Sequence, residues 1–251
     1  MSNRSRESAP RRVPTTQKPS GRARAQRAPS RAPWLLGGIV VAIAVVIALI
    51  LVFGGGGGSS SATKLHHDTA QAVLGGPAGP EGIALETGTL LAPAPTGSTG
   101  QTIDGIQCDP NEQAVYHVHT HLTVYVNGVL RPIPPGIGIV QPVAAQSPNG
   151  AFYSASTCYY WLHVHAQDGI IHIESPTVES YQLGSFFDIW DQPLSTTRVA
   201  TAGGAVTVFV DGVRYDGDPT RILLGNREDI QIDVGSPVVP PMRVDWSKSQ
   251  L

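Results

Sequence analysis

Hydrophobic and polar residues alternate with period two over residues 115–126, VYHVHTHLTVYV. Val118, Leu122, Val124 and Val126 fall on one face of this segment, and the polar residues fall on the other. An extended chain places successive side chains on opposite sides, so the pattern predicts a half-buried β-strand.

Alternating segments also flank three dipeptides that are typical of tight turns. These dipeptides are Asn127-Gly128, Asp168-Gly169 and Asp211-Gly212. Asn-Gly and Asp-Gly favour two-residue type I′ turns between antiparallel strands, so each dipeptide predicts a β-hairpin.

Two further elements complete the predicted domain. Residues 183–190, LGSFFDIW, predict a short helix, and residues 228–234, EDIQIDV, predict a final strand. The expected fold is mainly β, with antiparallel hairpins in a sandwich or partly open barrel and one short helix.

An uncharged apolar run, WLLGGIVVAIAVVIALILVF, occupies residues 34–53. Twenty residues of helix span about 30 Å, the hydrocarbon thickness of a bilayer, so the run predicts an N-terminal transmembrane helix. A cleaved signal peptide is the alternative, but its apolar region is usually shorter, roughly 7 to 15 residues.

The first 33 residues carry nine of the 17 Lys and Arg residues and one of the 19 acidic residues. Such a basic, apolar-poor segment is expected to be a disordered cytoplasmic tail, because positive charge next to a span marks its inner side. The chain is then a single-pass membrane protein with its C-terminal domain extracytoplasmic. The same charges could serve as a nucleic-acid arm, but membrane topology accounts for them.

Composition divides the outer part of the chain into three regions. Residues 54–105 are rich in Gly, Ser and Pro and predict a flexible tether, residues 106–240 predict the β domain, and residues 241–251 predict a tail. Because most acidic residues lie after the span, this part is strongly acidic, which argues against binding to nucleic acid.

Cys108 and Cys158 are the two cysteines of the chain. An even cysteine count in an exported domain predicts a disulfide, and this one would stabilise the fold by about 4 kcal/mol on the chain-entropy model. The alternative is that Cys158 binds a metal.

Six of the eight histidines lie between residues 117 and 172. If Asp168-Gly169 forms a two-residue turn, His165 lies opposite His172 and His163 lies opposite Glu174, all on one face. Opposed Cβ atoms on neighbouring strands are about 5 Å apart, so these four side chains could converge on one ion.

Three imidazoles and a carboxylate suit a transition metal, with zinc or copper favoured. Glu174 could be the fourth ligand, a hydrogen-bond acceptor that orients His163, or a catalytic base. His117, His119 and His121 add candidate ligands on the first strand, and at most two of them can share one ion on a straight strand. A dinuclear site and a single site with a histidine-rich approach both fit.

Two other interpretations of the histidines stay open. They could line an ordinary solvated sheet face, or they could form a proton-responsive cluster. Motifs of serine hydrolases, P-loop proteins and dinucleotide-binding proteins are absent from the sequence.

Three segments, HVHTHLTVYVNG, CYYWLHVHAQDGIIHIESP and LGSFFDIWDQPL, resemble a group of uncharacterised bacterial and archaeal exported proteins, often with one N-terminal span. The resemblance covers residues 117–194 and implies that these motifs form one unit. The ligand layout alone is also similar to that of carbonic anhydrase, which raises hydrolase or lyase chemistry as an analogy.

These observations predict a membrane-anchored, extracytoplasmic domain that binds a transition metal for handling or sensing. One alternative is a metal-dependent hydrolase or lyase with three His ligands and Glu174 as base. The other is a non-catalytic interaction module. The identity of a protein partner does not follow from the sequence.

Overall fold

The computed structural model describes residues 71–95 and 97–251. The predicted cytoplasmic tail, the predicted span at residues 34–53 and the first part of the predicted tether lie outside these ranges. Within them, no helix is long and apolar enough to cross a membrane.

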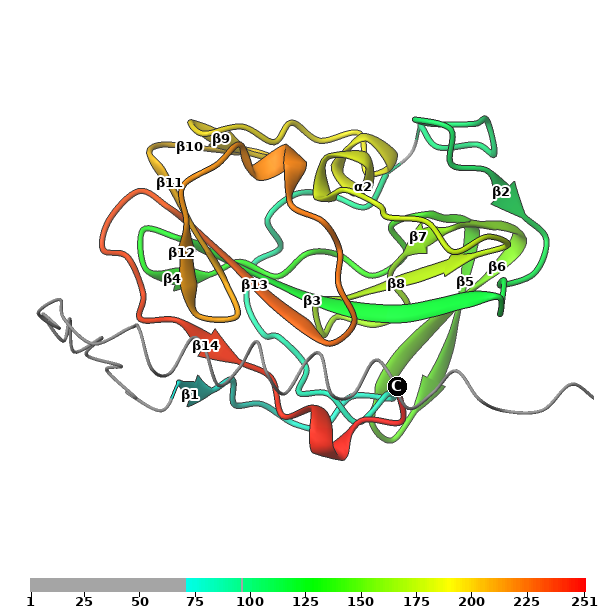
Figure 1. Cartoon of the computed structure of the whole chain (residues 1–251). Coiled ribbons are helices and arrows are strands. Elements are labelled where there is room, and N and C mark those ends of the chain that lie inside the picture. The colour runs from blue at the N-terminus through cyan, green and yellow to red at the C-terminus, as the bar shows by residue number, and fades with distance from the viewer. Residues whose placement is uncertain (1–70, 96) are drawn as a thin grey trace, which may run out of the picture. The chain divides into compact units, whose positions relative to one another are not determined.

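The described residues form a mainly β fold with a single α-helix, α2 (Leu183–Ile189) (Figure 1). Two 3-10 helices also occur, η1 (Pro219–Arg221) and η2 (Trp246–Lys248). The strands are β1 (Ala72–Val73), β2 (Cys108–Asp109), β3 (Tyr116–Val126), β4 (Val129–Leu130), β5 (Ile139–Ser147), β6 (Gly150–Tyr160), β7 (Leu162–His163), β8 (Ile170–Ser175), β9 (Arg198–Val199), β10 (Ala202–Gly203), β11 (Val206–Val210), β12 (Val213–Tyr215), β13 (Glu228–Val234) and β14 (Met242–Arg243).

An open seven-stranded sheet forms the centre of the fold. Its order is β12-β11-β13-β3-β8-β7, and β4 pairs with β3 beside this path. Three other small sheets pair β2-β6-β5, β10-β9 and β1-β14. The sheets are not closed, and the architecture matches the predicted sandwich.

The central sheet is mixed, whereas antiparallel hairpins alone were expected. β13 runs parallel to β3, with Glu228 opposite Thr120 and Val234 opposite Val126. A parallel neighbour cannot be joined by a tight turn, so short-range turn signals cannot predict this pair.

Two of the three predicted turns are confirmed. Asn127-Gly128 joins β3 to β4 and Asp211-Gly212 joins β11 to β12, and all four residues have the positive φ of a type I′ turn.

The third predicted turn, at Asp168-Gly169, is wrong. Only Gly169 has positive φ, because the buried Asp168 carboxylate accepts a hydrogen bond from the Ile170 N–H and holds a wider loop over residues 164–169. The pairing therefore shifts by two residues, and His163 lies opposite His172 instead of Glu174.

The apolar face of the central sheet forms the main core. Leu122, Val124, Leu162, Ile171 and Ile173 are fully buried there. The predicted helix is confirmed as α2, which packs against this face through its buried side chains Leu183, Phe186, Phe187 and Ile189.

The polar face of the sheet is also buried along most of β3. The strand predicted at residues 115–126 is therefore confirmed, but the prediction that only one of its faces is buried is wrong. Residues 239–244 cover the polar face on one side, where the Val239 N–H donates to Asp233 and the Met242 N–H donates to Gln231. Residues 71–95 cover it on the other side, with Ile83 buried against Ile170 and Val244.

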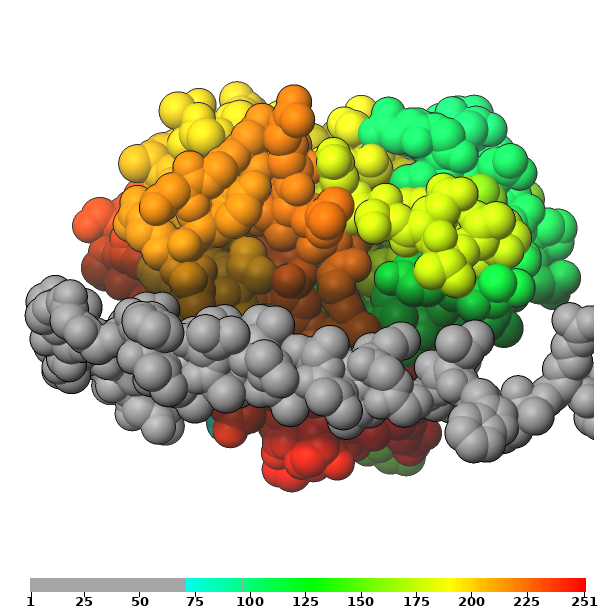
Figure 2. All heavy atoms as spheres, viewed as in Figure 1, coloured from blue at the N-terminus to red at the C-terminus, as the bar shows by residue number. Residues whose placement is uncertain are grey.

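Two segments predicted to be irregular therefore belong to the folded unit. Residues 71–95 fall in the predicted tether and residues 241–251 are the predicted tail, yet β1 and β14 pair in parallel side by side (Figure 1). In Figure 2, segments from the middle of the chain, coloured green and yellow, lie beside later segments coloured orange.

The predicted disulfide between Cys108 and Cys158 is confirmed and joins β2 to β6. The described residues include no free cysteine, so a metal-binding role for Cys158 is excluded.

Candidate metal centre

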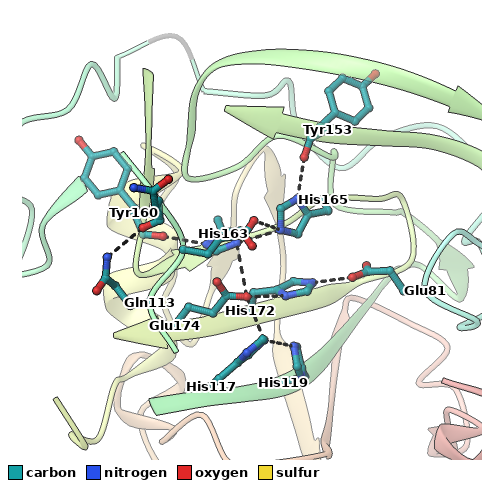
Figure 3. Close-up of polar contacts among 12 residues, drawn as sticks. Glu81, Gln113, His117, His119, Tyr153, Tyr160, His163, His165, His172 and Glu174 are labelled. Atoms are coloured by element: carbon teal, nitrogen blue, oxygen red, sulfur yellow. Dashed lines mark hydrogen bonds and ion pairs between the residues drawn. The ribbon is translucent and has the colours of Figure 1, made fainter. Parts of the chain in front are cut away.

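Three neighbouring strands align three histidines in one row on the polar face of the sheet. His119 of β3 lies opposite His172 of β8, and His172 lies opposite His163 of β7. The adjacent row brings His117 opposite Glu174. The strand pairing itself therefore gathers these side chains (Figure 3).

His163, His165, His172 and Glu174, here called the inner set, each offer a donor atom within 4.8 Å of the others. All four are buried. The sequence predicted this quartet, although through a different register. His165 belongs to it because the loop after β7 turns its ring back, so that His165 Nε2 lies 3.0 Å from His163 Nε2.

Hydrogen bonds fix the orientation of both rings in this pair. His163 Nδ1 lies 2.8 Å from the Tyr160 carbonyl oxygen, and His165 Nδ1 lies 2.6 Å from the Tyr153 carbonyl oxygen (Figure 3). A carbonyl can only accept, so each Nδ1 carries a hydrogen. In neutral rings both Nε2 atoms then present lone pairs to each other, and either a metal ion or a proton between them would relieve this contact.

The spacing of these nitrogens matches a metal site. Two nitrogen ligands on a tetrahedral zinc ion lie about 3.3 Å apart when each bond is about 2.0 Å. The pair of His163 and His165 is close to that value. Phe152 stacks on His165 with ring centroids 4.3 Å apart, which restricts movement of the ring.

His117, His119, His172 and Glu174, here called the outer set, form a second group of the same kind. His117 Nε2 lies 3.1 Å from His119 Nε2 and 3.0 Å from Glu174 Oε1. The two sets share His172 and Glu174. The outer set differs in that His117 is 44% exposed.

His121, the sixth predicted ligand, belongs to neither set. Its Nε2 lies 3.4 Å from Glu86 Oε1, and its Nδ1 accepts from or donates to the Thr123 hydroxyl at 3.2 Å. Burial opposes protonation of His121, but the carboxylates of Glu86 and Asp229 outweigh it and raise its pKa. His121 thus interacts with Glu86 and Asp229 and lies outside both groups of candidate metal ligands.

Three carboxylates that contact the histidines were not predicted. Glu81 Oε1 lies 3.0 Å from His172 Nε2, Glu112 Oε1 lies 3.2 Å from His165 Nε2, and Glu86 contacts His121. One signal was available, because Glu81 and Glu86 are the only charged residues between positions 71 and 95. No comparable feature of the sequence identifies Glu112.

Burial changes the protonation of the inner set. It lowers the pKa of His163 and of His172 well below the usual value, and neighbouring imidazoles add to this effect. Burial also opposes protonation of His165, yet the Glu112 carboxylate and the Tyr153 carbonyl raise its pKa overall. Of these two rings, His165 is therefore the more readily protonated.

Unsatisfied polar atoms test whether a cation fits here. Glu174 Oε2 and Glu81 Oε2 are buried and form no hydrogen bond with any described residue. Such atoms are costly in a protein interior, and a bound cation would satisfy them. The donor set, the spacing and these atoms all fit a transition metal.

The position of Glu174 favours a ligand over a catalytic base. Its Oε1 lies 3.2 Å from His172 Nδ1 and 4.0 Å from His163 Nε2, so it lies among the donors. Burial and then the Glu112 charge raise the pKa of Glu174 to about 8.

No protein-family model, curated protein or solved structure matches this chain. The resemblance to exported proteins stays a prediction, and the function is argued from the site.

Proposed function

We propose that the protein is a membrane-anchored, extracytoplasmic domain that binds zinc or copper through the inner set and serves in metal handling or sensing. The observation that carries this proposal is the pair of His163 and His165, whose Nδ1 atoms face backbone carbonyls while their Nε2 atoms lie 3.0 Å apart. This arrangement orients both lone pairs toward one cation.

The donor types support zinc or copper(II) over other ions. Imidazole suits zinc, copper, iron and nickel, whereas calcium and magnesium prefer oxygen donors. No thiolate is present among the described residues, which disfavours copper(I).

Burial of the site supports handling or sensing over catalysis. The side chains of the inner set are at most 4% exposed. A catalytic zinc site keeps an open coordination position for water or substrate, whereas a closed site retains its ion. The apolar run at residues 34–53 and the disulfide support a membrane-anchored domain in an oxidising compartment.

Elemental analysis of the full-length protein, purified in detergent and reconstituted with zinc or copper, tests the proposal. We expect near-stoichiometric metal in the wild-type protein and its loss in a variant with His163→Ala, His165→Ala and His172→Ala. His121→Gln is the matched control, because His121 lies on the same face outside both sets. Absence of metal from the reconstituted wild-type protein would sink the proposal in favour of an interaction module or a proton-responsive cluster.

A further inference from the structure

We infer that the cluster is a two-ion centre, in which the outer set holds a second ion and admits metal to the inner set. The inference rests on the proposed function and adds a second position and a route. It begins from the two donor sets, which share two residues but differ in exposure.

One ion cannot use all the donors. Ligands on opposite sides of a single ion lie about 4.2 Å apart, so a common site requires every donor pair to stay near that limit. Within residues 71–95 and 97–251, the donors group as two sets that each fit within 4.8 Å, and His117 and His119 fall in one while His163 and His165 fall in the other. Two adjacent ion positions follow.

Glu174 is placed to bridge the two positions. Its Oε1 lies 3.0 Å from His117 Nε2 in the outer set, and 4.0 Å from His163 Nε2 in the inner set. Its Oε2 is buried and without a hydrogen bond to any described group. A carboxylate with both oxygens available can join two ions about 3.5–4 Å apart.

His172 lies at the junction of the two sets. Its ring meets His119 edge-on at a centroid distance of 4.6 Å and meets His165 in the same way at 4.6 Å. The opposite pairing of His119, His172 and His163 across the strands holds this ring in the centre. Loss of His172 therefore affects both positions.

The difference in solvent exposure between the two sets indicates the side from which an ion enters. The His117 side chain is 44% exposed, while that of His163 is 0% exposed. An ion arriving from solvent thus meets His117 first and can pass to the inner donors by exchanging ligands at Glu174 and His172. Glu112, also 44% exposed, adds a negative charge near His165 at the approach.

Copper(II) titration of the full-length protein in detergent, followed by electron paramagnetic resonance, tests the two-ion centre. We expect the first equivalent to produce a signal and the second to diminish it, because ions joined by Glu174 couple their spins. His117→Ala, at an exposed position, should bind one equivalent tightly and keep its signal. His121→Gln should behave as the wild-type protein.

The outcomes separate this inference from the proposed function. A single copper with a persistent signal, or two copper ions with independent signals, overturns the two-ion centre and leaves metal binding intact. Retention of no copper overturns the proposed function itself.

The route has its own measurement. Stopped-flow absorption should show the inner copper loading at least about 10-fold more slowly in His117→Ala than in the wild-type protein. Equal loading rates would overturn the outer set as the entry position.

Discussion

At the scale of single residues, Glu174 couples metal binding to the release of a proton. In the metal-free protein its pKa is raised to about 8, so at pH 7 most molecules carry a proton on this carboxyl. A metal ion binds the carboxylate, so binding must displace that proton.

Glu174→Gln removes this proton and the negative charge while keeping the size of the side chain. We expect metal affinity to fall about 10- to 100-fold and proton release at pH 7 to decrease by about one per protein molecule. Calorimetry in two buffers of different ionisation enthalpy measures both quantities. Unchanged proton release in the variant would show that Glu174 is not the group displaced.

His119 makes the stability of the metal-free protein depend on pH. Burial, with a contribution from His117, lowers its pKa from 6.5 to about 4. As pH falls below 6.5 the unfolded chain takes up a proton that the folded chain refuses, so the stabilising contribution present above pH 6.5 is lost toward pH 4.

His119→Gln should remove this loss. Between pH 6.5 and 4 the unfolding free energy of the wild-type protein should fall more steeply than that of the variant, by up to about 1.4 kcal/mol per pH unit. Urea unfolding of both metal-free proteins at pH 7, 6 and 5 provides the comparison. Parallel curves would contradict the assignment.

At the scale of elements, the site depends on how closely β7 approaches the start of β5. Gly138, which has φ +70°, lies where an added Cβ would overlap the Leu162 carbonyl oxygen and approach His163 Cβ to 2.9 Å. The chain pairs there, because the Val164 N–H donates to Ile137 and the Tyr160 N–H donates to Gly138. A side chain at this position must displace β7.

Gly138→Ala should therefore weaken both folding and metal binding. Gly105→Ala is its matched control, since Gly105 has φ +81° and no heavy atom within 4 Å of an added Cβ. The control should lower the free energy of unfolding only by the backbone strain, about 1–2 kcal/mol, and should leave metal affinity unchanged. Urea midpoints and metal titrations compare the two variants, and equal effects in both would argue against the steric contact.

The accuracy of the sequence predictions also differs among elements for a physical reason. Asn127-Gly128 and Asp211-Gly212 adopt the turn that their residue types favour, since local backbone preference decides a tight hairpin. At Asp168 the side chain is buried and bonds to Ile170, so tertiary packing overrides the local preference. The quartet was nevertheless identified, because a shift of two residues keeps every side chain on its face.

At the scale of the whole molecule, the parts that were missed come from distant segments. Glu81, Glu86 and Glu112 reach the histidines from segments that carry no regular periodicity. Likewise, the parallel pairing of β13 with β3 joins residues about a hundred positions apart in the chain. Such contacts depend on the assembled fold and leave no local pattern.

The disulfide stabilises this assembly over a separation of 50 residues. Replacing Cys108 and Cys158 by Ser should lower the unfolding free energy by about 4 kcal/mol on the chain-entropy model. Because Glu112 follows Cys108 closely and contacts His165, metal affinity should also decrease. Urea unfolding checks the first effect, and the reduced wild-type protein should match the double variant. If reduction leaves the midpoint unchanged, the link contributes nothing to stability.

Metal binding to the row of His119, His172 and His163 depends on the correct alignment of three strands. A slip of one residue in β3, β8 or β7 would turn an imidazole to the apolar face and remove a donor. An ion bound through His172 therefore stabilises only the arrangement in which all three strands are in register. Metal retention would therefore distinguish molecules with correctly paired strands from misaligned ones, a form of quality control that suits the extracytoplasmic location proposed above.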